Sequence, residues 1–253
     1  MKNMTIMSAA FVLVAAIPVV AVSSSDDKVG FNFFGFGASV QLPSSADDED
    51  SDGISSNVAF DAETRALLKV GDAAKGKEIA ANNKCNKCHS ENGIAEDPAD
   101  PNLAGQMASY TYKQLRDYRD QKRDDRSMYK RTKKLSNEDM AHLSAWYASL
   151  PVPERMGKAS DATLELVNKG DPKRMIKACG SCHGRGGEGG MHDSATLNGM
   201  SQEYFVATME AFKEGDREND IYSRMRLIAE PLTEAEVTAL ADFYATQPPA
   251  EEE

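Results

Sequence analysis

Apolar and polar positions divide the chain into three kinds of segment. A predominantly apolar run extends from Ile6 to Val22 and is followed by the small residues Ser23 and Ser24. Residues 23–57 are rich in Ser, Asp and Gly and show no sustained helical period, which is typical of a solvated linker. From about Asp61 onward, apolar residues recur at helical spacing between short polar breaks, and strand-like alternation is nearly absent.

The helical region predicts two similar sets of helices. Two pairs of helices are expected at residues 72–83, 109–121, 171–178 and 201–214. The last helix of each set should begin at a capping box, formed by Ser136 with Asp139 in one and by Thr233 with Glu236 in the other. The pattern therefore predicts an all-α fold.

An internal repeat explains why the helices come in two sets. The segment Cys85, Cys88 and His89 recurs as Cys179, Cys182 and His183. The same spacing carries further residues of the first copy onto the second, namely Leu103 onto Leu197, Gly105 onto Gly199 and Tyr110 onto Tyr204. After a three-residue insertion near residues 217–221, Met128 corresponds to Met225. Two tandem copies of one domain are the simplest account.

Both repeated segments read Cys-x-x-Cys-His, the signature of covalent c-type haem attachment. Two thiols three positions apart on a helical turn can each form a thioether with the macrocycle, and the adjacent His then faces the iron. The alternatives are a structural zinc site of four cysteines and a redox-active dithiol. A zinc site would leave the two histidines and the repeat unexplained, and no βαβ pattern supports a dithiol.

The sixth iron ligand is predicted to be Met, because Met128 and Met225 stand at the same place in both copies. Each lies seven residues before a Leu that precedes the last helix. Most Met residues fill gaps in cores, so packing is the competing interpretation. Only His142 and His192 remain as other imidazoles, and neither is repeated, although His192 in its Gly-rich loop is an alternative ligand.

Taken together, the order of helix, Cys-x-x-Cys-His, Leu-x-Gly turn, second helix, Met and final helix, given twice, resembles the dihaem cytochrome c4 family. The resemblance covers residues 61–247 and implies two class I cytochrome c folds related by a pseudo-twofold axis, with His and Met axial ligands. It also implies that the carbonyl of Pro101 supports the axial His89, with Ala195 at that place in the second copy. Ser90 departs from the family, which usually has Gly there, as at Gly184.

The predicted organisation is a signal peptide or membrane anchor at residues 1–23, a flexible acidic and Ser-rich linker at 24–60, cytochrome c domains at 61–152 and 153–248, and an acidic tail at 249–253. The aromatic patch between Phe31 and Phe36 has no assigned role. We expect export to the periplasm, with possible anchoring of the N-terminal segment to the inner membrane. The formal net charge of −11 disfavours nucleic-acid binding.

A haem with both axial positions filled by protein has no open site for a substrate, so the expected function is one-electron transfer by a carrier and not catalysis. Expected partners are redox proteins such as a quinol–cytochrome c reductase, a terminal oxidase or another cytochrome. Alternatives are the cytochrome subunit of a larger complex, such as a flavocytochrome, or a dihaem peroxidase. A thiosulfate-oxidising enzyme with a Cys ligand is excluded, because the two motifs use all four cysteines.

The two copies differ in charge near their candidate Met ligands. Residues 113–134 carry ten Lys and Arg against four Asp, whereas residues 207–231 carry four basic residues against six acidic ones. A solvated helix with exposed charge pairs is one interpretation. The other is that the two ends present opposite fields, so that an acidic partner docks at the first copy and a basic one at the second.

Overall fold

The computed structural model describes residue 56 and residues 58–153 and 157–245. All of them belong to one compact unit, Asp52–Glu253. The segment 1–23, the Phe31 to Phe36 patch and the tail 249–253 lie outside the described residues, so the expectations about them remain predictions. Among the described residues, no helix is long and apolar enough to cross a membrane.

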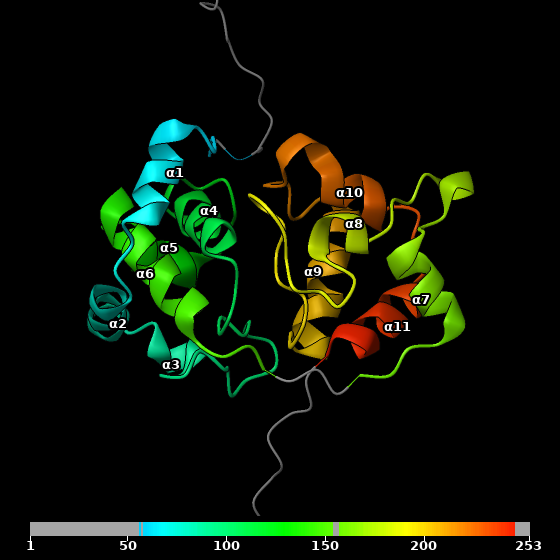
Figure 1. Cartoon of the computed structure of the whole chain (residues 1–253), viewed down its shortest axis with the longest axis horizontal. Coiled ribbons are helices and arrows are strands. Elements are labelled where there is room, and N and C mark those ends of the chain that lie inside the picture. Colours follow the sequence, from blue (N-terminus) through cyan, green and yellow to red (C-terminus); the bar gives the residue numbers. More distant parts are fainter. Residues whose placement is uncertain (1–55, 57, 154–156, 246–253) are drawn as a thin grey trace, which may run out of the picture. The chain divides into compact units, whose positions relative to one another are not determined.

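The secondary structure of the described residues is helical, as predicted (Figure 1), apart from two isolated β-bridges. The helices of the first half are α1 (Ala62–Lys69), α2 (Ala73–Asn82), α3 (Asn86–His89), α4 (Ala108–Arg119), α5 (Arg126–Thr132) and α6 (Asn137–Ser149). Those of the second half are α7 (Asp161–Asn168), η1 (Pro172–Arg174), α8 (Gly180–His183), α9 (Gln202–Glu214), η2 (Ile221–Ser223), α10 (Arg224–Ala229) and α11 (Glu234–Tyr244).

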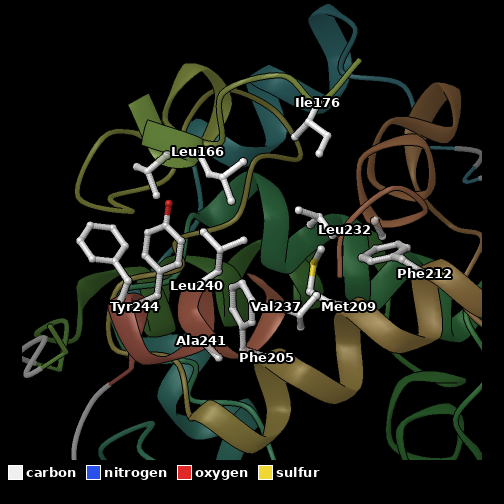
Figure 2. Close-up of a cluster of buried hydrophobic side chains, with 13 residues drawn as sticks. Leu166, Ile176, Phe205, Met209, Phe212, Leu232, Val237, Leu240, Ala241 and Tyr244 are labelled. Carbon is white, nitrogen blue, oxygen red and sulfur yellow. The ribbon is translucent and has the colours of Figure 1, made fainter. Parts of the chain in front are cut away.

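Each half builds its own hydrophobic core around its last helix. In the first half, Leu143 and Tyr147 of α6 pack with Tyr112 of α4. In the second half, Leu240 and Tyr244 of α11 pack in a cluster with Phe205 and Met209 of α9 (Figure 2). These are the apolar positions that the helical period of the sequence predicts to face inward.

Local capping chemistry fixes where several helices begin. Both predicted capping boxes form: Ser136 caps α6 with Asp139, and Thr233 caps α11 with Glu236. The carboxylate of Asp72 accepts hydrogen bonds from two amides at the start of α2, as its sequence position predicts.

The predicted helix at residues 171–178 is wrong. The chain instead makes the short turn η1, after which Met175 takes a left-handed conformation with φ of 58°. The Asp171 amide donates to the Ile176 carbonyl at 2.8 Å, and the Ile176 amide donates to the Asp171 carbonyl at 2.9 Å, which closes a tight loop in place of a helix. Helix α7, which begins at the Ser160 cap just before this loop, contacts α11, as α9 also does.

The end of the predicted linker is part of the folded unit. Val58 is buried in the first core, and Phe60 packs against the same cluster. Ser56 donates a 2.5 Å hydrogen bond to the Asp117 carboxylate on α4. Val58 and Phe60, which the sequence pattern assigns to the linker, are therefore part of the first core, because both side chains cover its apolar surface.

Equivalent residues of the two copies exchange hydrogen bonds. Asn102 donates its side-chain amide to the Gly199 carbonyl at 2.8 Å, and Thr196 donates its hydroxyl to the Gly105 carbonyl at 3.3 Å. The spacing that carries Cys85 onto Cys179 carries Asn102 onto Thr196 and Gly105 onto Gly199. Each copy thus donates one side-chain hydrogen bond to the same backbone carbonyl position of the other copy, which is the contact pattern of a pseudo-twofold axis.

Candidate haem sites

The first Cys-x-x-Cys-His motif forms a single helical turn, α3. Cys85 precedes it with helical backbone angles, and its carbonyl accepts a hydrogen bond from the His89 amide at 3.1 Å. Cys85 and Cys88 are therefore three positions apart on one turn, so that their side chains lie on neighbouring parts of one face. Both are free thiols.

The second motif repeats this geometry in α8. The Cys179 carbonyl accepts a hydrogen bond from the His183 amide at 2.9 Å, and Cys179 and Cys182 are free thiols. Each turn ends at a residue with positive φ: Gly184 at 77° and its counterpart Ser90 at 53°. This conformation explains the preference for Gly after the motif, because a side chain is strained there.

Each histidine is held by a backbone carbonyl. The Nδ1 atom of His89 lies 3.0 Å from the Pro101 oxygen, and that of His183 lies 2.8 Å from the Ala195 oxygen. Since a carbonyl can only accept, both Nδ1 atoms carry the proton and both Nε2 atoms keep a lone pair. Burial lowers the pKa of both imidazoles, which favours this neutral form. The support expected from Pro101 and Ala195 is present.

A cavity opens beside each motif. The first has an empty volume of about 1300 Å³ and is lined by Cys85, Cys88 and His89 on one side and by Met128 of α5 among other residues. Its walls also include four leucines, Leu103, Leu115, Leu135 and Leu143.

The second cavity has an empty volume of about 870 Å³. Cys179 and His183 line it together with Met225 of α10, and Leu197 and Ile228 contribute apolar wall. Met128 and Met225 therefore each lie on the wall of the cavity that holds the histidine of their own copy.

Other candidate ligands are placed differently. His142 accepts a hydrogen bond from the Asp72 amide at its Nδ1 atom, at 2.9 Å, so it has a structural partner. His192 is exposed and lies with its ring 5.1 Å from that of Phe60, and it is not among the residues that line the second cavity. Met200 lines both cavities and Met209 lines the second, but neither has a Met counterpart in the repeat.

The zinc interpretation finds no support in this geometry. Among the described residues, no three or more His, Cys, Asp and Glu side chains are grouped closely enough to hold a metal ion. The four cysteines therefore do not converge on one site. Cys85 and Cys88 line the first cavity and Cys179 lines the second, and both cavities have largely apolar walls suited to a large apolar group. Thr111 also lines the first cavity, and its buried hydroxyl has no hydrogen-bond partner among the residues that the structure describes. The residues present fit a haem.

Comparison with known proteins agrees with this geometry. The family model of cytochrome c matches residues 73–151. A cytochrome c4 from Thiocapsa roseopersicina is 32% identical over 190 residues, which cover 72% of this chain and 96% of that protein. The chain belongs to the cytochrome c4 family. As a member of the cytochrome c4 family, it binds two haem c groups covalently and takes part in electron transfer.

Two further similarities bear on its role within the cytochrome c4 family. The solved structure of reduced recombinant cytochrome c4 from Pseudomonas stutzeri matches with a TM-score of 0.63 at 28% identity, over 69% of this chain and 98% of that one. A thiosulfate dehydrogenase electron acceptor from Thiomonas intermedia is 33% identical over 170 residues, which cover 65% of this chain and 78% of that protein.

The structure corrects the expectation that the basic stretch 113–134 is a solvated surface. Lys113 is 1% exposed and forms a 2.6 Å ion pair with Asp117, which is also 1% exposed. Arg123 is partly buried and donates to Tyr204 of the other copy. The exposed basic positions near the first cavity are further along, around Lys130, Lys133 and Lys134. Sequence reasoning missed this division because it does not show which face of α4 meets the second copy.

Proposed function

We propose that the chain is an exported dihaem carrier in which Cys85 and Cys88 attach one haem and Cys179 and Cys182 the other. His89 and His183 would each supply one axial ligand through Nε2, since Nδ1 is engaged by a carbonyl. The haems supply one-electron redox chemistry when bound. The observation that carries the proposal is that each motif, its supported histidine and a cavity occur together twice.

Met128 and Met225 would complete the two iron sites. Both lie on short helices, α5 and α10, at equivalent places in the repeat, and both line the cavity of their own copy. A thioether ligand raises the reduction potential of a haem, which suits electron delivery to a high-potential acceptor. With both axial positions occupied by protein side chains, a substrate would have no place on the iron, and electron exchange would be outer-sphere.

The donor is proposed to be a dehydrogenase that oxidises thiosulfate or a related sulfur compound. Support comes from the name of the Thiomonas relative, an electron acceptor of thiosulfate dehydrogenase. In this setting the chain would accept electrons as a partner or subunit of the enzyme, without holding the substrate itself. The peroxidase alternative requires a Met ligand that leaves the iron, and peroxide turnover by the purified protein would support that alternative.

The location is proposed to be the periplasm, reached through the apolar segment at residues 6–22. Sequencing the N-terminus of the mature protein distinguishes a cleaved signal from a retained anchor. A mature chain that begins near residue 24 in the periplasmic fraction supports export as a soluble carrier, and recovery in the cytoplasm contradicts the proposal.

The decisive experiment is the visible spectrum in alkaline pyridine together with the ratio of haem to protein. Two c-type haems per chain are expected, and one or none would overturn the assignment. Stopped-flow reduction of the oxidised protein by a thiosulfate dehydrogenase, with and without thiosulfate, then tests the donor. No thiosulfate-dependent reduction would reject the donor while leaving the carrier role intact.

A further inference from the structure

A cluster of polar side chains lies between the two copies and links their cavities. We call it the interdomain polar cluster, and its members are Tyr110, Gln114, Arg123, Tyr204 and Arg217. The Arg123 guanidinium lies on the wall of the first cavity and the Arg217 guanidinium on that of the second, while the other three residues line both cavities. The cluster is therefore shared wall between the two haem sites.

The two arginines make reciprocal contacts across the interface. Arg123 donates to the Tyr204 hydroxyl at 3.0 Å, and Arg217 donates to the Tyr110 hydroxyl at 3.0 Å. The repeat that carries Tyr110 onto Tyr204 also carries Arg123 onto Arg217. Each arginine thus binds the tyrosine of the other copy, so the arrangement follows the pseudo-twofold axis of the interface.

The backbone holds both arginines in the same way. The Arg123 amide donates to the Asp117 carbonyl at 3.2 Å, and the Arg217 amide donates to the equivalent Ala211 carbonyl at 3.0 Å. Equal loops after α4 and α9 therefore aim both side chains inward. The repeated backbone contact indicates that the two arginines occupy equivalent, defined positions in the fold and are not unrelated surface charges.

Both guanidiniums also converge on one neutral acceptor. The side-chain oxygen of Gln114 accepts from Arg123 at 2.8 Å and from Arg217 at 3.1 Å. The second copy has Thr208 at the place of Gln114, so only the first copy contributes this amide acceptor to the cluster. Two cations that share one oxygen lie close together and repel each other, which is unfavourable unless negative charge is near.

No carboxylate among the described residues pairs with either arginine to provide that negative charge. In the described part of the chain, neither Arg123 nor Arg217 forms an ion pair, and the nearby Asp117 is already paired with Lys113. Arg217 is 7% exposed, so water compensates it poorly. Although burial opposes ionisation, the charges of the two arginines lower the pKa of Tyr204 to about 8, which reflects the excess of positive charge.

A haem brings acidic side chains into its cavity. We propose that Arg123 and Arg217 are the counter-cations of the haem carboxylates and that Gln114, which holds both arginines, couples the reduction potentials of the two haems. The inference rests on the assignment of the two motifs as haem attachment sites. Positive charge beside a haem favours the reduced state, so the cluster raises both potentials.

The test uses the holoprotein with three charge-altering variants, one rescue variant and one control. Gln114→Glu keeps the shape of the side chain but places a carboxylate between the two arginines. Arg123→Gln and Arg217→Gln each remove one positive charge. Arg119→Gln, on the same helix α4, is the matched control, because Arg119 pairs with Asp120 and is not among the residues that line either cavity.

Spectroelectrochemical titration should show both potentials falling in Gln114→Glu. At a fixed applied potential the reduced-to-oxidised ratio is expected to fall by about tenfold for each haem, which corresponds to about 59 mV for a one-electron couple. Each Arg→Gln variant should lower one potential strongly and the other less, and Arg217→Lys should restore most of the loss. Arg119→Gln should leave both potentials unchanged.

A pH series gives a readout that a purely structural role would not move. Removal of a counter-cation raises the pKa of the haem carboxylate, so the potentials of Arg217→Gln should depend more strongly on pH between about pH 5 and 7, below the range in which Tyr204 titrates, than those of the parent. Unchanged potentials and pH profiles in Gln114→Glu and the Arg→Gln variants, at two haems per chain, would overturn this inference alone. A parent without two haems would instead overturn the proposed function.

Discussion

The Nδ1 atom of His183 lies 2.8 Å from the carbonyl oxygen of Ala195, although the equivalent carbonyl in the first copy belongs to a proline. The contact needs only a backbone oxygen at the right place, and the proline ring adds stiffness to the loop that carries it. Support of the axial histidine is therefore a property of the loop path and tolerates either residue.

Pro101→Ala should accordingly keep both haems. We expect the free energy of unfolding to fall by only about 0.4 to 1 kcal/mol, because the unfolded chain gains freedom while the hydrogen bond to His89 remains. Denaturant titration and the haem-to-protein ratio measure the two effects. Loss of the first haem in this variant would show that the ring itself positions the histidine.

The Met ligands are tested by Met128→Leu and Met225→Leu, which keep the volume of the side chain. Each variant should lose the sulfur-to-iron charge-transfer band of one haem and lower the potential of that haem, because the thioether ligand is gone. Met200→Leu is the control, since Met200 lines both cavities without a counterpart in the repeat. Persistence of both bands in Met225→Leu would identify another residue as the ligand.

Ser90→Gly should stabilise the protein. Ser90 has φ of 53° and ψ of 174°, a backbone region that costs a residue with a side chain about 1 to 3 kcal/mol. Glycine avoids this strain, but its more flexible unfolded chain offsets about 0.5 to 1 kcal/mol of the gain in folding free energy. A net gain of about 1 kcal/mol would raise Tm by roughly 2 to 4 °C in a unit of this size. Gly184→Ser in the second copy should lower Tm. Equal Tm values for the parent, Ser90→Gly and Gly184→Ser would show that the backbone at these positions is not strained.

Acid sensitivity should depend on Glu236, which forms a 2.6 Å ion pair with Arg174. The hydrogen bond from Arg174 lowers the pKa of Glu236 to about 2, below the ordinary value of 4.5. A depressed folded-state pKa means that its stabilisation is full above pH 4.5 and is lost as the pH falls toward 2. Glu236→Gln should remove about 1 to 2 kcal/mol of stability at neutral pH and flatten this acid dependence.

The matched control for Glu236→Gln is Asp139→Asn. Asp139 occupies the same capping-box position on α6 but forms no ion pair within the described residues. Asp139→Asn should lower the free energy of unfolding by only about 0.5 to 1 kcal/mol, the usual range for a lost cap interaction. Equal losses in the two variants at every pH would show that capping, and not the contact with Arg174, accounts for the effect.

Partner docking is expected to involve the exposed basic positions at the first cavity. Changing Lys130, Arg131, Lys133 and Lys134 to Glu should slow electron exchange with an acidic partner at low salt, by about tenfold or more, with the difference fading as salt is added. Lys75→Glu, on the exposed face of α2, is the control. Equal rates for parent and variant at low salt would rule out steering by this surface.

Local chemistry made much of this fold predictable. The capping residues Ser136 and Thr233 mark helix starts because their partners lie three positions away, and the turn at Cys85 is specified by its own motif. The loop after Asp171 was mispredicted because its shape depends on a distant partner: Arg174 bonds Glu236 as well as Asp171.

Interface residues were the least predictable. Nothing near Lys113 in the sequence indicates that it donates to the Asn219 carbonyl of the other copy at 2.5 Å. Arg123 and Arg217 could have been found, since they occupy equivalent positions in the repeat, but their contact with Tyr204 and Tyr110 depends on how the copies pack.

The exchange of equivalent contacts between the copies has the geometry of an isologous homodimer that a single polypeptide now joins. Three polar residues on α4 break the symmetry, Lys113, Gln114 and Asp117, because the second copy has Ala207, Thr208 and Ala211 at their places. Asn219 of the second copy bonds all three of them. A dimer of two first halves would bury two sets of these polar residues in its interface, and a dimer of two second halves would contain none. Each half is therefore complementary to the other and not to a second copy of itself, while the covalent connection supplies the high effective concentration that keeps the halves together.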